Sequence, residues 1–327
     1  MAQVDRRRFL AGAAALAVAP VARPQRKDLS RVGYLFSFVP SEGEHLWAAC
    51  RQGLAELGYV EGRNIALEPR WANGRHERLP ELVAELVRAN VDVVVSAATP
   101  ASLAAKRGAG RTPIVFVAVA DPVRAKLVET LARPGGTATG LTLLTPELSP
   151  KRLELLLEIA GPIARCAVLI NPANSAHEIF TEETEQAARA RKVAVQRLHA
   201  RTPEEIERAV AEAHESGAQG LIVFDDPVTW SHRKLVVAQA AKARLPVMYG
   251  YSEFVDEGGL VSYGPQRPDL YRRTAGYVDK ILRGASPATL AVERPSRFEL
   301  FLNRACARAL GLKIPASMAM LADRVIE

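Results

Sequence analysis

Four polar side chains stand at the same kind of position along this chain. Each follows a short, β-branched apolar run and directly precedes a proline; they are Thr99, Asp121, Asn171 and Asp226, in the segments 91–100, 113–122, 166–172 and 220–227. Hydroxyl, carboxylate and amide groups at such positions can hold a polar small molecule by hydrogen bonds. The spacing therefore predicts binding chemistry at the ends of strands.

The apolar runs are typical of buried strands in a parallel sheet. Proline is tolerated in the first turn of a helix, and a polar residue before it suits the N-cap position. We expect each polar residue where a strand ends and a helix begins, which is where open α/β sheets bind ligands. Two of these joints precede the midpoint and two follow it. The sequence thus predicts an α/β protein of two Rossmann-like lobes with parallel sheets, whose binding edges face one cleft.

Composition and charge narrow the function classes. The 327 residues, 48% of them hydrophobic, suffice for two ordinary domains. The net charge is +7, of which +2 lies in residues 1–22, leaving +5 for the remainder. The remaining basic residues alternate with glutamates, as in 204–215, which is typical of solvated helix faces. We therefore expect no nucleic-acid partner.

The residues that could bind a metal or a cofactor show no suitable spacing. Three cysteines, Cys50, Cys166 and Cys306, lie far apart without a CxxC motif, and six histidines are scattered. These patterns favour small buried thiols over a zinc site. No GxxxxGK[ST] and no complete GxGxxG motif occurs, so we predict neither a metal nor a cofactor. No run of 18 apolar residues indicates a transmembrane helix.

The amino terminus has the anatomy of a signal peptide. Residues 5–22 begin with Arg6-Arg7-Arg8, continue through an alanine-rich apolar run and end in small residues. The arginines followed by Phe9-Leu10 resemble a twin-arginine export motif, although Asp5 stands where Ser or Thr is common. We predict a signal peptide over 1–22 and a linker over 23–30. An amphipathic first helix is the alternative.

The rest of the chain alternates between strand and helix patterns. Residues 31–36 and 64–71 are predicted strands, 79–89 a helix, and 133–140 a turn. The alternation restarts after Pro150 and ends with a strand at 259–264 and a long helix at 270–284. A further helix is expected near 123–132.

The order of several short motifs resembles one family. They are GLAELGYVEGRNIALEPRWANG, SAATPAS, VFVAVADPV, RPGGTATGLT, LINPAN, GGLVSYG and ARALGLKIPAS. Together, over most of 31–318, they are similar to the ABC-transporter substrate-binding proteins that include the tryptophan/tyrosine-type binders. This resemblance implies a type I periplasmic-binding-protein fold with a hinge cleft. By that analogy, 31–141 with 263–289 form one lobe, and 142–262 with 290–327 the other.

The resemblance also implies which residues bind a ligand. Ser96, Thr99 and the helix starting at Pro100 match a segment whose hydroxyl and N–H groups suit a carboxylate. Asp121 matches a DP joint, and Asn171 with Asn174 matches an NPxN joint. The family often has Asp-Asn where this chain has Asp225-Asp226, which leaves an aspartate for an ammonium group but removes an amide.

Each of these assignments has a structural alternative. Asp121 and Asp226 can be helix caps, whereas Asp225 precedes the cap position and is better explained by ligand contact. Phe38, Tyr249 and Tyr263 fall near the predicted cleft loops, where they either stack on a planar ligand or pack in the core.

The leading interpretation is an exported, periplasmic binding protein that performs no chemistry. It would be a monomer that delivers a small carboxylate-bearing, amino-acid-like ligand to an ABC permease in the inner membrane by hinge closure. The alternatives are a two-lobed α/β enzyme, such as a racemase or hydrolase, and a sugar-repressor-like regulator. A racemase would need paired catalytic cysteines, a hydrolase a GxSxG motif, and a regulator a helix-turn-helix before residue 31.

Overall fold

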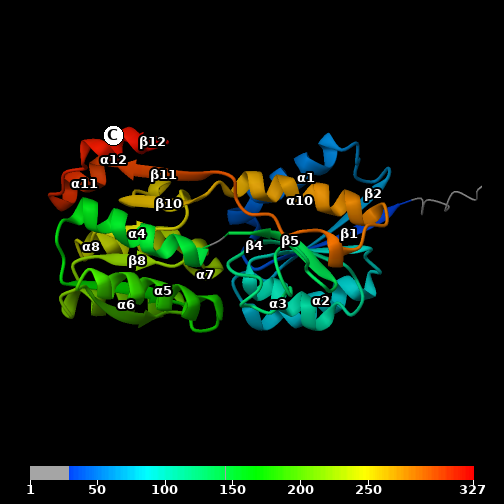
Figure 1. Ribbon diagram of the computed structural model, residues 1–327, viewed down its shortest axis with the longest axis horizontal. Helices are drawn as coiled ribbons and strands as arrows, with labels where there is room; N and C mark the ends of the chain where they lie inside the picture. The colour runs from blue at the N-terminus through cyan, green and yellow to red at the C-terminus, as the bar shows by residue number, and fades with distance from the viewer. Residues whose placement is uncertain (1–28, 144) are drawn as a thin grey trace, which may run out of the picture.

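Two sheets lie end to end along the long axis, each with helices on both faces (Figure 1). The structure is a computed structural model that describes residues 29–143 and 145–327. The expected signal peptide at 1–22 and nearly all of the expected linker at 23–30 lie outside the described residues.

The first sheet is parallel throughout. Its order is β2-β1-β3-β4-β5, formed by β1 (Ser30–Phe36), β2 (Ile65–Trp71), β3 (Val93–Ala97), β4 (Ile114–Val119) and β5 (Ala138–Thr142). The flanking elements are α1 (Pro40–Glu56) and α10 (Arg267–Leu282) on one face, and η1 (His76–Arg78), α2 (Leu79–Arg88) and α3 (Thr99–Gly108) on the other. Side chains alternate along each strand between these two apolar cores, as a sheet buried on both faces requires.

The second sheet has the order β12-β11-β10-β9-β8-β6-β7. Its strands are β6 (Arg165–Ile170), β7 (Ala194–His199), β8 (Leu221–Val223), β9 (Val247–Tyr249), β10 (Val261–Pro265), β11 (Phe298–Asn303) and β12 (Arg324–Ile326). Its helices are α4 (Thr145–Ala160), α5 (Ala176–Ala190), α6 (Pro203–Glu215), α7 (Pro227–Ser231), α8 (Arg233–Lys242), α9 (Glu253–Asp256), α11 (Arg304–Leu310) and α12 (Ala316–Leu321). The short η2 (Pro287–Thr289) lies beside β5 of the first sheet.

The two sheets share one winding pattern. The run β7-β6-β8-β9-β10 repeats the order of β2-β1-β3-β4-β5, with the strand order reversing beside the first strand of each unit. This confirms the predicted α/β fold of two Rossmann-like lobes. One detail differs, because β11 runs antiparallel to β10. It returns from the first lobe after α10 and so enters the sheet from the opposite end.

Two local predictions were wrong. The helix expected near 123–132 is a series of turns, capped by the Asp121 carboxylate, which accepts N–H groups from Val123 and Arg124 at 2.9 Å each. The turn expected at 133–140 instead leads into β5. Gly140 pairs with Phe116 of β4, and this position requires glycine because a Cβ there would lie 1.9 Å from the Phe116 carbonyl oxygen.

Three segments connect the two sheets (Figure 1). The first joins β5 to α4, the second is Gln266 between β10 and α10, and the third runs from η2 to β11. The expected boundary at 263 falls inside β10, which stays paired with β9 and β11. Residues just after 289 still bond to β5, since Glu293 N–H donates to the Gly140 carbonyl at 2.9 Å. Which residues move together as a lobe stays a prediction.

Candidate ligand-binding site

A small cavity lies between the carboxyl ends of the two sheets. Its lining comes from both lobes: Ala98, Thr99, Ala118, Ala120 and Leu143 from the first, and Asn174, Ala176, Phe180, Asp225, Pro227 and Tyr251 from the second. It encloses about 10 Å³, which is room for about one water molecule. A ligand of amino-acid size therefore requires the lobes to separate or the lining side chains to rotate.

The second-lobe half of this site is organised around Asp226. Its carboxylate caps α7 by accepting the Val228 N–H at 2.8 Å, and it accepts the side-chain amides of Asn171 and Asn174 at 3.0 and 2.9 Å. The side chain is fully buried. Asp226 is therefore the predicted helix cap, and its two oxygens are occupied by protein donors.

His177 joins the two loops that carry these residues. Its Nδ1 accepts the Asn171 N–H at 2.8 Å, so the proton is on Nε2, which donates to the Asp225 carbonyl at 3.2 Å. Burial lowers its pKa, whereas the carboxylates of Asp226 and Asp225 act in the opposite direction and His76 of η1 acts with burial. The neutral imidazole thus fixes the positions of both loops.

Asp225 is paired with a residue that the sequence did not single out. Arg152 of α4 donates from Nη2 to the Asp225 carboxylate at 3.0 Å and from Nε to the Tyr263 carbonyl at 2.8 Å, and both side chains are almost fully buried. Gly250 makes room for the pair, because a Cβ there would lie 1.5 Å from Asp225 Oδ1. That Oδ1 atom and Arg152 Nη1 have no hydrogen-bond partner among the described residues.

The first-lobe half of the site is the start of α3. The helix begins at Thr99, with Pro100 in its first turn, and its N-cap residue, Ala98, provides no capping side chain. Thr99 was expected at the N-cap but is the first helical residue, and its hydroxyl accepts the Ala120 N–H at 3.3 Å. Free N–H groups at such a helix start attract an anion.

Backbone strain marks the same edge. Ala98 and Ala118 have φ angles of +73° and +57° and both line the cavity. Alanine is uncommon at positive φ, and such strain gathers at functional sites.

Four other predicted residues lie elsewhere. The Ser96 hydroxyl is within 2.9 Å of the Ser102 hydroxyl inside the first lobe, and Asp121 caps its turn. Tyr249 stacks on Phe254 with ring centroids 4.6 Å apart, in the core of the second lobe. The Tyr263 ring lies 6.1 Å from that of Phe298. None of the four lines the cavity.

An aromatic contact joins the lobes beside the cavity. The Phe38 ring, on the loop after β1, lies 4.9 Å from that of Trp230 in α7. Arg267, at the start of α10, lies between Trp230 and Tyr251, 4.3 and 4.0 Å from their ring centroids. It also pairs with Glu253 at 2.9 Å. Sequence patterns gave no sign of this cation–π arrangement.

Comparison with known proteins identifies the family to which this chain belongs. Residues 44–326 match the family model for ABC transporter substrate binding proteins. The chain belongs to this family. A tyrosine-binding protein of Clostridioides difficile is 24% identical over 263 residues, which span 80% of this chain and 75% of the relative.

Two solved structures resemble this family member closely. A conserved domain protein of Vibrio cholerae has a TM-score of 0.86 and 27% identity, over 90% of this chain and 99% of that one. An ABC domain of Streptococcus pneumonia in complex with L-Trp has a TM-score of 0.85 and 25% identity, over 91% and 99% of the two chains. The expected family and the type I periplasmic-binding-protein fold are confirmed.

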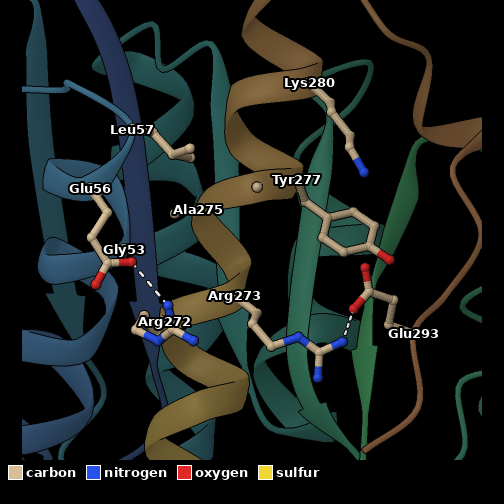
Figure 2. Close-up of a pocket in the computed structure, with 10 residues that line it drawn as sticks. Gly53, Glu56, Leu57, Arg272, Arg273, Ala275, Tyr277, Lys280 and Glu293 are labelled. Atoms are coloured by element: carbon tan, nitrogen blue, oxygen red, sulfur yellow. Dashed lines mark hydrogen bonds and ion pairs between the residues drawn. The ribbon is translucent and has the colours of Figure 1, made fainter. Parts of the chain in front are cut away.

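A larger pocket of this substrate-binding protein is a less suitable ligand site. It has a volume of about 270 Å³ and lies on the outside of the first lobe between α1 and α10 (Figure 2). Its arginines are already neutralised: Arg272 pairs with Glu56 and Arg273 with Glu293 (Figure 2). Lys280 points toward the Tyr277 ring.

Residues 29–143 and 145–327 contain no group of three metal-ligating side chains. None of the helices described in this family member is long and apolar enough to cross a bilayer.

Proposed function

We propose that this protein is an exported binding component of an ABC importer, which holds an amino-acid-like ligand between its lobes. The observation that carries the proposal is one cavity lined by both the uncapped start of α3 and the unpaired Asp225 Oδ1. A helix N-terminus stabilises a carboxylate, and a carboxylate oxygen accepts hydrogen bonds from an ammonium group. The two together suit a zwitterion.

The ligands of the relatives support an aromatic amino acid. One relative is a tyrosine-binding protein and one similar structure holds L-Trp. In this chain, Phe38, Trp230 and Tyr251 border the cavity or lie beside it. We infer that an aromatic side chain would pack against them once the lobes separate.

The signal-peptide pattern of residues 1–22 supports export to the periplasm, and family membership supports delivery to a permease of the inner membrane. We propose that the protein acts as a monomer.

Burial of two thiols counts against the racemase alternative. Desolvation raises the pKa values of Cys50 and Cys166 to about 12, so neither is a ready nucleophile or base. Cys50 lies in the first lobe under α10, and neither thiol lines the cavity. We therefore propose binding without catalysis.

Calorimetric titration with matched analogues tests the ligand class. L-Tryptophan and L-tyrosine would be compared with tryptamine, which lacks the carboxylate, and indole-3-propionate, which lacks the ammonium group. Each loss removes a charge-assisted hydrogen bond and should weaken binding by about tenfold or more. A sugar or a simple dicarboxylate that bound more tightly than every amino acid would contradict the proposal.

A further inference from the structure

A second cavity lies inside the second lobe, away from the cleft. It has a volume of about 220 Å³ between α8, β9 and α11, and it shares no lining residue with the cavity between the lobes. Its walls are mainly apolar, with Val237, Leu245 and Leu310 among them. An engineered apolar cavity of about 150 Å³ binds benzene, so this volume admits a single aromatic ring.

Two glycines lie in the wall of this cavity. Gly258 and Gly259 form part of the lining, and a Cβ at Gly259 would lie 2.6 Å from the Tyr249 ring. Gly258 has a φ angle of +101°, which side chains rarely adopt.

Three polar side chains also line this cavity. Tyr249 is 1% exposed and lines the cavity. Its phenol group can donate a hydrogen bond to a polar group of a ligand. Cys306 adds a half-buried thiol, and Arg244 adds an exposed guanidinium that donates to the Ala309 carbonyl at 3.4 Å but forms no ion pair among the described residues.

We propose that this cavity binds a small aromatic carboxylate as a second ligand site, independent of the cleft. The ring lies between the apolar walls, the carboxylate pairs with Arg244 at the rim, and the Tyr249 hydroxyl bonds to the ligand. Tyr249, which the sequence assigned to the cleft ligand, thereby gains a role in a different site. A ligand of about ten non-hydrogen atoms should bind with a dissociation constant of about a millimolar.

Protection of Cys306 from alkylation reports occupancy directly. The chain has three cysteines, and burial raises the pKa values of Cys50 and Cys166 to about 12. Burial also raises the pKa of Cys306, but this thiol is the one that is partly exposed, so iodoacetamide should label it first. The probe is phenylacetate, with phenylacetamide as the matched neutral compound. We expect saturating phenylacetate to slow alkylation of Cys306 about fivefold or more, and phenylacetamide to require about tenfold higher concentration for the same effect.

Variants separate this site from general charge effects. Arg244→Gln should raise the phenylacetate concentration needed for protection about tenfold, and Tyr249→Phe should raise it severalfold. Lys242→Gln, which removes an exposed charge of α8 outside the cavity, should leave it unchanged. Absence of protection in the wild-type protein, or equal losses in Arg244→Gln and Lys242→Gln, would overturn the proposal.

A final variant distinguishes binding of phenylacetate in this cavity from binding in the cleft between the lobes. Asp225 lines the cleft and not the second cavity, so Asp225→Asn should leave protection of Cys306 unaltered. If protection disappears in Asp225→Asn, phenylacetate acts through the cleft and the second site is wrong. Because this readout needs no ligand in the cleft, its outcome is separate from that of the proposed function.

Discussion

At the residue scale, the site depends on the buried pair of Arg152 and Asp225. The sequence pointed to Asp225 because it precedes the cap position. The sequence also carries a signal for Arg152: Leu148, Arg152 and Leu155 share one helical face, so the arginine lies in an apolar stripe. A charge in such a stripe indicates a buried partner.

Removing this arginine should be costly. Arg152→Met leaves Asp225 buried without its counter-charge, which should lower the free energy of unfolding by about 3–5 kcal/mol. Urea denaturation measures the change, with Lys151→Met, an exposed neighbour, expected within about 0.5 kcal/mol of wild type. Adding Asp225→Asn to Arg152→Met should recover part of the loss. Equal stabilities of Arg152→Met and Lys151→Met would contradict the importance of the pair.

His177 gives the stability a defined pH dependence. Burial lowers its pKa in the folded protein, whereas the unfolded chain takes up this proton near pH 6.5. Stability should therefore fall as the pH decreases from about 6.5 through the lowered pKa, by up to about 1.4 kcal/mol per pH unit, and this residue has no effect above that window.

Urea denaturation at about pH 7.5 and about pH 5.5 measures this contribution. His177→Gln, which keeps an acceptor and a donor, should lose part of the pH dependence. His214→Gln, an exposed control, should retain all of it. The assignment fails if His177→Gln and wild type show the same pH dependence.

At the element scale, the start of α3 carries strain that the fold imposes. Ala98 has φ +73° between β3 and α3. Ala98→Gly should relieve this strain and raise the free energy of unfolding by about 1 kcal/mol after the backbone entropy of glycine is counted. Ala55→Gly, at an exposed position inside α1, should lower it by about 1 kcal/mol. A loss in both variants would show that the geometry at Ala98 costs little.

Most elements could be predicted because their apolar runs are long and bounded by proline or polar residues. β1, β2, β6 and α2 lie within a residue or two of their expected positions. β5 could not be predicted, because Gly140 and its threonine neighbours read as a turn, while pairing with β4 makes the segment a strand. The pattern after Asp121 looked helical, but the carboxylate caps a turn instead.

The residues of the site were predictable only in part, because local sequence patterns locate strand ends but not contacts between distant elements. Thr99, Asn174 and Asp225 line the cavity because strand ends bring them there. Side chains alternate between the two faces of a sheet along a strand. The Ser96 side chain is on the face of β3 that packs against α3, where its hydroxyl meets that of Ser102. The Arg267 contacts join α10 to α7 and to the loop after β9, so no local pattern reveals them.

At the scale of the whole molecule, the contacts between the lobes differ in how deeply they are buried. The ion pairs of Arg267 with Glu253 and of Arg233 with Glu42 are partly buried, whereas others are exposed. Arg124 of the first lobe reaches Glu182 and Glu183 of the second at 3.4 and 3.5 Å, but these side chains are largely exposed and such pairs contribute little. The contact of Phe38 with Trp230 is buried.

This difference predicts unequal effects on ligand affinity. Phe38→Ala should weaken binding of the most tightly bound amino acid by about tenfold. The aromatic contact stabilises the closed form and not the open form, so its loss makes closure less favourable. Arg124→Gln should change the dissociation constant less than about twofold. Calorimetric titration of both variants checks this, and a larger effect of Arg124→Gln would reverse the ranking.

Closure on the ligand is the central claim, and small-angle X-ray scattering tests it most directly. The three connecting segments at the ends of β5 and β10 and before β11 would serve as the hinge, since a few residues there can absorb the rotation. Saturation with the amino acid that binds most tightly should lower the radius of gyration of the wild-type protein and leave that of Asp225→Asn unchanged at the same concentration. An unchanged scattering curve for the wild-type protein, at a ligand concentration that calorimetry shows to be saturating, would contradict binding by closure of the cleft.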